Sequence, residues 1–138
     1  MSTERETSYG GVVVRGQDVI VIVPRGRRRV LGLPKGGPNP GERPEETAAR
    51  EVREETGVTA TVREPLGDVN YWYRRGGRRV YKTVHFYLCD YVSGSTSDHD
   101  HEVEDARWIP LTEARTALSY PGERALIERA LSKSTPGR

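Results

Sequence analysis

Three glutamates in the middle of the chain have the spacing needed to act together. Glu51, Glu54 and Glu55 stand at positions i, i+3 and i+4 of the segment PEETAAREVREET, residues 44–56. If this segment is helical, that spacing puts the three carboxylates on one face. Such a face is often only solvated, but several carboxylate oxygens together are also what magnesium and manganese ions require as ligands.

The segment just before it, LPKGGPNPGE at residues 33–42, is too rich in glycine and proline for a helix or a strand. We therefore expect an ordered loop. Glycine lets a backbone come close to a ligand, so this loop can bring its carbonyl and N–H groups, together with Lys35, near a phosphate or a metal ion.

The segment 44–56 has the features of a helix with defined ends. Pro44 fits the first helical turn, the two glutamates that follow it favour the positive end of the helix dipole, and Gly57 fits the position just after the last turn. Ala48 and Val52 give a narrow apolar stripe that can pack on a sheet. The sequence thus predicts a helix that presents its carboxylates beside the glycine-rich loop.

The remaining segments predict a sheet and two further helices. Residues 9–26 form two β-branched runs around the turn signal RGQD, and the runs 60–73 and 79–92 flank RRGG, so each pair predicts a hairpin. A polar loop (93–105), a short strand (106–110) and two helices (111–118 and 122–133) follow. We expect one α/β domain over residues 1–138, with a mixed β-sheet between helices, order from about residue 8 to residue 133, and polar tails.

Composition narrows the class of protein. The chain has 138 residues and a net charge of +2, which is too small to indicate a general nucleic-acid binder. The cation-rich runs RGRRR (25–29) and RRGGRR (74–79) suit a polyanionic small molecule better than a long duplex. One cysteine, Cys89, lies in an apolar run, and no segment is apolar enough for a signal peptide or a membrane span. We expect a cytoplasmic protein without membrane contact.

Nine positions of residues 36–58 follow the pattern G-x5-E-x7-R-E-U-x-E-E-x-G-U, where U is a bulky apolar residue. They are Gly36, Glu42, Arg50, Glu51, Val52, Glu54, Glu55, Gly57 and Val58. This pattern resembles the Nudix box. The flanking hairpins and terminal helices resemble the Nudix fold, an α/β/α sandwich with a mixed sheet. The resemblance implies a pyrophosphohydrolase that cleaves a nucleoside diphosphate linked to another group and uses Mg2+ or Mn2+.

The resemblance also implies roles for individual residues of the box. Glu51, Glu54 and Glu55 would bind the divalent cation, assisted by a backbone carbonyl of Lys35 or Gly36. Glu54 would be the group that takes a proton from the attacking water.

Other positions of the box would support these groups. Glu42 and Arg50 would form an ion pair that braces the loop against the helix, and Gly36 and Gly57 would be structural. Glu102 stands six residues before Trp108 in the later polar loop, SDHDHEVEDARW. It is a second candidate for the general base or for a further metal ligand.

The substrate is expected to be a dinucleoside polyphosphate, because the PKG…PGE form of the box and the strand KTVHFYL resemble diadenosine polyphosphate hydrolases. Lys82 would face the polyphosphate, since a lysine in an apolar strand is costly to bury without an anionic partner. His85 is assigned to the same substrate, although strand alternation places it on the other side of the sheet from Lys82. Further substrate contacts are assigned to Lys35, to Arg29 of the basic run, and to Tyr120 and Tyr73 as adenine-stacking rings.

Several alternatives remain open. The same chemistry could serve oxidised nucleoside triphosphates, sugar nucleotides, inositol pyrophosphates or RNA 5′ ends, the last being the one form of nucleic acid considered as a partner. A non-catalytic nucleotide sensor is a third hypothesis, weakened because such proteins usually lose a box glutamate and this chain keeps all of them. The sequence leaves open whether the protein is a monomer or a homodimer.

Overall fold

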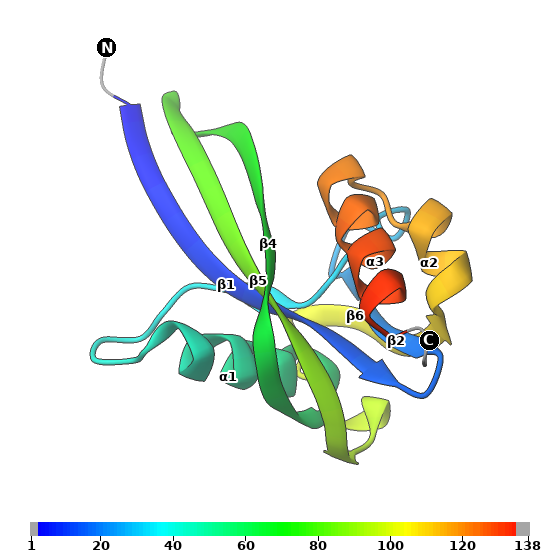
Figure 1. The fold of residues 1–138 in the computed structure, drawn as a ribbon. Coiled ribbons are helices and arrows are strands. Elements are labelled where there is room, and N and C mark those ends of the chain that lie inside the picture. Colours follow the sequence, from blue (N-terminus) through cyan, green and yellow to red (C-terminus); the bar gives the residue numbers. More distant parts are fainter. Residues whose placement is uncertain (1–2, 135–138) are drawn as a thin grey trace.

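The computed structural model describes residues 3–134 and contains a six-stranded mixed sheet with helices on both faces (Figure 1). The elements are β1 (Thr3–Arg15), β2 (Asp18–Pro24), β3 (Lys35–Gly36), α1 (Pro44–Thr56), β4 (Val58–Arg75), β5 (Arg78–Gly94), the 3₁₀ turn η1 (Thr96–Asp98), β6 (Val103–Pro110), α2 (Leu111–Ala117) and α3 (Pro121–Ser134). The sheet order is β4-β5-β1-β2-β6, with β3 paired to β1. Strands β1 and β5 run parallel and the other pairs are antiparallel, so the predicted mixed sheet is confirmed.

Each face of the sheet buries its own apolar cluster. On one face, Val52 of α1 packs with Val13, Ile20 and Cys89. On the other face, Ala114 of α2 and Ile127 of α3 pack with the strand side chains that point to that side. This arrangement is an α/β/α sandwich, as expected, because successive side chains of each strand point to opposite faces.

The two predicted hairpins are present. Val14 pairs with Val19 across the first turn, and Arg75 pairs with Arg78 across the second. Gly76 and Gly77 between them have φ of 56° and 81°. A two-residue hairpin loop with positive φ at both positions matches the right-handed twist of the strands, which explains why GG stands there.

Several boundaries differ from the prediction. Residues 3–7 were expected to be a loose tail, but they form the start of β1 and pair with residues 79–83 of β5. Lys35–Gly36 forms a two-residue strand against β1 rather than a loop alone. The strand expected at 106–110 begins at Val103, and β5 continues to Gly94. Residues 135–138 of the expected C-terminal tail lie outside the described residues.

The three strands β1, β4 and β5 extend past the helices as a long twisted arm, at the top of Figure 1. Their pairing is continuous from Thr3 to Val14 in β1 and along most of the β4–β5 hairpin. Among residues 3–134, no helix has the length and apolar character needed to cross a membrane.

Candidate active site

Helix α1 begins and ends as its sequence predicts. The backbone N–H of Arg43 donates to the Glu46 side chain at 2.9 Å, and Pro44 follows at the first helical position. At the other end Gly57 adopts a left-handed conformation with φ 79°, and its N–H donates to the Arg53 carbonyl. Ala48 and Val52 are fully buried, so the predicted apolar stripe is confirmed. The three glutamates lie beside this stripe, with Glu51 and Glu55 partly buried and Glu54 exposed.

Arg50 holds the loop, the helix and two of the glutamates together. Its Nε donates to Glu42 Oε2 at 2.6 Å and its Nη2 to Glu42 Oε1 at 3.0 Å and to the Gly37 carbonyl at 2.8 Å. Its Nη1 contacts Glu51 at 3.2 Å and Glu54 at 3.1 Å. The hydrogen bonds from Arg50 lower the pKa of Glu42 to about 2. The expected Glu42–Arg50 ion pair is confirmed.

Glu51 and Glu55 lie in a partly dry position against β3. A Cβ added at Gly36 would stand 2.1 Å from the Glu51 Cδ, so only glycine leaves room for this carboxylate. Glu55 accepts a hydrogen bond from the backbone N–H of Lys35 at 3.1 Å. Burial raises the pKa of Glu51, and it raises the pKa of Glu55 to about 8. Two partly buried carboxyl groups are therefore held beside β3, with the Arg50 guanidinium next to Glu51 and the Lys35 N–H next to Glu55.

The three glutamates do not converge on one point. Among the described residues, no group of three or more acidic, histidine or cysteine side chains is arranged to hold a metal ion. Arg50 explains this, because it draws one oxygen of Glu51 and one of Glu54 toward itself. Glu54 is also more open, with 44% of its side chain exposed against 15% for Glu51.

Two neighbouring cavities lie next to the glutamates of α1. One of about 170 Å³ is lined by Glu55 and Glu102. The other, of about 620 Å³, follows the inner side of the β4–β5 hairpin and is lined by Tyr71, Tyr73 and Lys82. Four residues line both cavities: Arg27, Lys35, Tyr120 and Glu123. A ligand could thus reach from the glutamates, past Lys35, to the aromatic side chains.

Most of the expected substrate residues therefore meet in one place, and two do not. Lys35, Lys82, Tyr73 and Tyr120 line the larger cavity together. His85 lies on the opposite face of the sheet, where its ring stacks on Tyr9 and Nδ1 contacts Asp68 at 2.7 Å. Strand alternation is the reason, because no bulge shifts β5 between Lys82 and His85.

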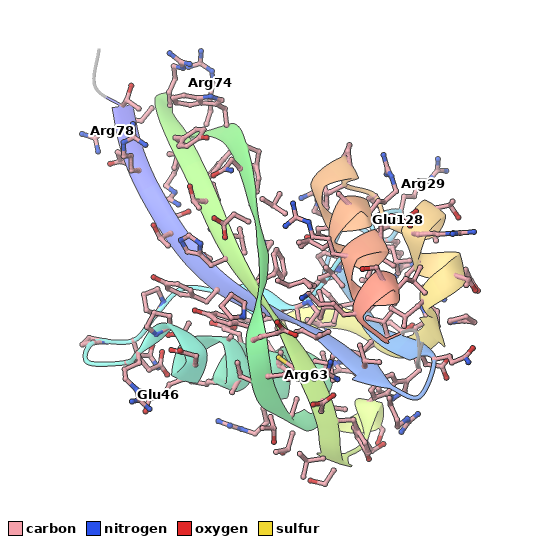
Figure 2. The ribbon with its side chains drawn as sticks, in the orientation of Figure 1. Arg29, Glu46, Arg63, Arg74, Arg78 and Glu128 are labelled. Carbon is pink, nitrogen blue, oxygen red and sulfur yellow. The ribbon has the colours of Figure 1, made fainter. Side chains whose placement is uncertain are left out.

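Arg29 also departs from the expectation. It is exposed in the loop after β2, and its side chain points outward beside the helical layer (Figure 2). Neither of the two cavities described above is lined by Arg29, whereas Arg27 of the same basic run lines both. The turn that follows Pro24 causes this, since the Arg27 N–H donates to the Pro24 carbonyl and folds that residue back toward the sheet.

Lys82 has an anionic partner within the protein. Its Nζ contacts Glu6 Oε1 at 2.9 Å, and Glu6 also accepts hydrogen bonds from Tyr73 and Arg75 at 2.5 Å each. The hydrogen bond from Tyr73, followed by those from Arg75 and Lys82, lowers the pKa of Glu6 to about 2. The sequence did not indicate this partner, because Glu6 belongs to a segment expected to be loose.

Glu123 is a site residue that sequence reasoning missed. It is 2% exposed, and its Oε1 accepts a hydrogen bond from the Leu33 N–H at 3.0 Å. Burial raises its pKa to about 7. In the sequence it is an ordinary acidic residue in the first turn of a helix, and no local signal shows that the loop at residues 31–33 closes over it.

The fold and the site together define an α/β/α sandwich protein with a carboxylate face packed against a glycine loop. The NUDIX domain model matches residues 4–130, and the chain belongs to the Nudix family. It is 44% identical to a protein named mutator protein MutT4 from Mycobacterium tuberculosis, over 94% of this chain and 56% of that protein. It is 33% identical to an 8-oxo-(d)GTP phosphatase from Mycolicibacterium smegmatis, over 92% of this chain and 38% of that protein. The chain thus spans about half or less of these relatives' length.

Solved structures agree on the fold. A NUDIX hydrolase from Nitrosomonas europaea matches with a TM-score of 0.75 and 21% identity, covering 94% of this chain and 90% of that one. A Caenorhabditis elegans Ap4A hydrolase matches with a TM-score of 0.69 and 19% identity, covering 93% and 96%. At this identity the likeness shows the fold alone. It therefore gives the expected diadenosine branch no specific support.

Proposed function

We propose that this protein is a divalent-cation-dependent pyrophosphohydrolase that cleaves nucleoside triphosphates to a nucleoside monophosphate and pyrophosphate, with oxidised purine nucleotides as preferred substrates. The carrying observation is the pair of partly buried carboxylates, Glu51 and Glu55, beside Lys35 at the junction of two cavities. The names of the two sequence relatives, a mutator protein and an 8-oxo-(d)GTP phosphatase, support the choice of substrate.

The donor set fits a divalent cation. Glu51 and Glu55 are partly buried carboxyl groups whose pKa is raised because the effect of burial outweighs that of the nearby positive charges of Arg50 and Lys35. A hard cation with oxygen ligands would supply further positive charge there. Glu51, Glu54 and Glu55 would hold Mg2+ or Mn2+, with Glu102 and a carbonyl of Lys35 or Gly36 as further donors. Such a cation, when bound, neutralises charge on phosphoryl oxygens and makes a bound water more acidic.

The protein's own residues would then position the reacting groups. Lys35 and Arg27 line both cavities and would bind the phosphate chain from two sides. Arg50 keeps Glu51 and Glu54 at fixed places through its branched hydrogen bonds. Glu54, the more exposed of the two, would take the proton of the water that attacks phosphorus, and Glu102 is the alternative base.

The purine base of the substrate would lie in the larger cavity. Tyr120 and Tyr71 line it together and offer flat apolar surfaces for a purine, each stacking contact being worth about 1–3 kcal/mol. The buried carboxyl group of Glu123 lines the same space and can hydrogen-bond a purine edge.

A second candidate substrate is a dinucleoside polyphosphate. Three cationic residues, Arg27, Lys35 and Lys82, line the larger cavity, and a row of this kind suits a phosphate chain longer than three. Because Lys82 is already paired with Glu6, this observation is weaker than the one above.

A substrate panel separates these possibilities. The protein would be incubated with Mg2+ or Mn2+ and with 8-oxo-dGTP, dGTP, diadenosine tetra- to hexaphosphates, ADP-ribose or a 5′-triphosphorylated RNA, and the products separated by anion exchange. We expect the highest kcat/KM with 8-oxo-dGTP, and release of its monophosphate. Faster turnover of diadenosine pentaphosphate would favour the second candidate, and no turnover of any member would refute both.

A further inference from the structure

The two faces of the projecting arm carry different chemistry. The arm consists of residues 3–7 of β1, 69–75 of β4 and 78–84 of β5, with Arg74 and Arg78 near its tip (Figures 1 and 2). In the sheet register, Trp72 pairs directly with Tyr81, Arg74 with Arg79, and Arg5 with Tyr81 from the other side. Paired residues share a face, so alternation assigns every side chain of the arm to one face or the other.

On the cavity face, arginines and lysine are neutralised by carboxylates. Arg78 forms an ion pair with Glu4, and Glu6 accepts hydrogen bonds from both Arg75 and Lys82. These ion pairs neutralise the positive charge of the cavity face. They leave little free positive charge there for a further partner.

The opposite face has cations and aromatic rings without acids. Its alternating positions in the arm, all within the described part of the chain, are Thr3, Arg5, Thr7, Asn70, Trp72, Arg74, Arg79, Tyr81 and Thr83. We call Arg5, Trp72, Arg74, Arg79 and Tyr81 the platform. No Asp or Glu occurs among these nine positions, so the charge of this face is uncompensated.

The platform residues stack on one another. The Trp72 and Tyr81 rings lie 4.8 Å apart, the Arg79 guanidinium stands 4.3 Å over the Trp72 ring, and that of Arg5 stands 5.5 Å from the Tyr81 ring. Trp72 nevertheless remains 50% exposed, among the most exposed large apolar side chains of the described residues. Stacked arginines keep their positive charge while the ring faces stay flat and accessible.

Helix α1 covers this side of the sheet only below the arm, as Figure 1 shows. The platform is thus an open sheet face that combines several arginines with the exposed Trp72 ring and the partly buried Tyr81 ring. Phosphate charge beside flat bases is the chemistry that complements it. A second copy of the chain fits poorly, because a symmetric contact would bring the same uncompensated arginines face to face.

We propose that the platform binds single-stranded nucleic acid, with Arg5, Arg74 and Arg79 contacting phosphates and with Trp72 and Tyr81 stacking on bases. This surface lies on the face of the arm opposite the larger cavity and does not depend on hydrolysis. Oligonucleotide binding by the platform and hydrolysis at the cavity can therefore be refuted independently.

The test is a fluorescence anisotropy titration of the intact protein against labelled twelve-residue oligouridylate and oligothymidylate at low salt. Trp72→Ala should weaken binding at least about fivefold and Trp72→Phe, which keeps a ring, by much less. Arg5→Gln/Arg79→Gln should weaken it at least about tenfold and make the salt dependence shallower. The RNA and DNA arms show which of the two chains is preferred.

A matched control is available on the other face. Arg75→Gln/Arg78→Gln removes the same charge, but from arginines that already have carboxylate partners, and should weaken binding less than about threefold. Equal losses in the two double variants would overturn the proposal, as would absence of oligonucleotide binding at protein concentrations of about 100 μM. So would displacement of the oligonucleotide by hexaglutamate at equal charge, or a dimer in solution that Trp72→Ala dissociates.

Discussion

At the residue scale, Gly36 is the position of the site where the absence of a side chain matters most. A methyl group there would collide with the Glu51 carboxylate at 2.1 Å, whereas a Cβ at Gly37 would meet nothing within 4 Å. We expect Gly36→Ala to displace the Glu51 carboxylate and lower kcat/KM at least about tenfold, since small misplacements of catalytic groups are costly. Gly37→Ala is the matched control and should lose much less. Equal activity of both variants in a pyrophosphate-release assay would show that Glu51 does not need its present position.

Glu54 is the glutamate of the box with the most open side chain. Glu54→Gln keeps the shape and a hydrogen bond with Arg50 but removes the group that accepts a proton, so kcat should fall at least about 100-fold. Glu45→Gln, the same change at an exposed position of the same helix, is the control for charge. Full activity in Glu54→Gln, together with loss in Glu102→Gln, would assign the general base to Glu102 instead.

The residues of the box and the ion pair within it could be anticipated from spacing, but the partners of site residues outside the box could not. The ion pair of Glu42 and Arg50 follows from an eight-residue separation that a loop and one helix can close. The partners of Lys82 and Glu123 come from segments 76 and 90 residues away in the sequence. No local pattern specifies such contacts, because they depend on how the strands and helices pack.

At the scale of elements, the end of α1 depends on Gly57. Its φ of 79° suits glycine, and a Cβ there would approach the Ser95 carbonyl oxygen to 2.3 Å. Gly57→Ala should therefore lower the free energy of unfolding by more than the conformational term of about 1–2 kcal/mol alone. Gly16→Ala is the control: its φ is 61° and nothing lies within 4 Å of the added Cβ, so its loss of stability measures the conformational cost alone. Urea denaturation of both variants gives the difference, and equal losses would exclude the collision with Ser95.

Secondary structure was predictable where periodicity and turn residues agree. The helix at 44–56 and the RRGG hairpin are examples, because proline, glycine and apolar spacing all indicate the same ends. The N-terminal part of β1 was missed since TERET is polar and alternates no apolar residues. It becomes a strand only because β5 offers it a parallel partner, and that is a tertiary effect.

At the scale of the whole molecule, Glu6 connects the N-terminal part of β1 to the β4–β5 hairpin. Tyr73, Arg75 and Lys82 lower its pKa from 4.5 to about 2. A carboxylate with a lowered pKa contributes stability that is present above its unfolded value and is lost as the pH falls from about 4.5 through 2. The stability lost in Glu6→Gln should therefore be largest near neutral pH and shrink below pH 4.5. Urea midpoints measured from pH 7 to pH 3 test this, and a difference that does not change with pH would contradict it.

The layers of the molecule separate two surfaces. The glutamates of α1 lie close to the cavities lined by residues of the segments 27–35 and 120–123, and the platform lies on the face of the arm opposite the larger cavity. The order of layers could be expected from the alternating strands and amphipathic helices. The confinement of the acids to one face of the arm could not, because it needs the parallel register of β1 on β5.

The most direct test of the central claim is a ³¹P NMR time course of 8-oxo-dGTP hydrolysis by the purified protein, with Mg2+ and with the cation chelated. We predict that 8-oxo-dGMP and pyrophosphate appear together in equal amounts and only when Mg2+ is present. Orthophosphate with the nucleoside diphosphate, turnover that continues without a divalent cation, or no turnover with either Mg2+ or Mn2+ would contradict the account.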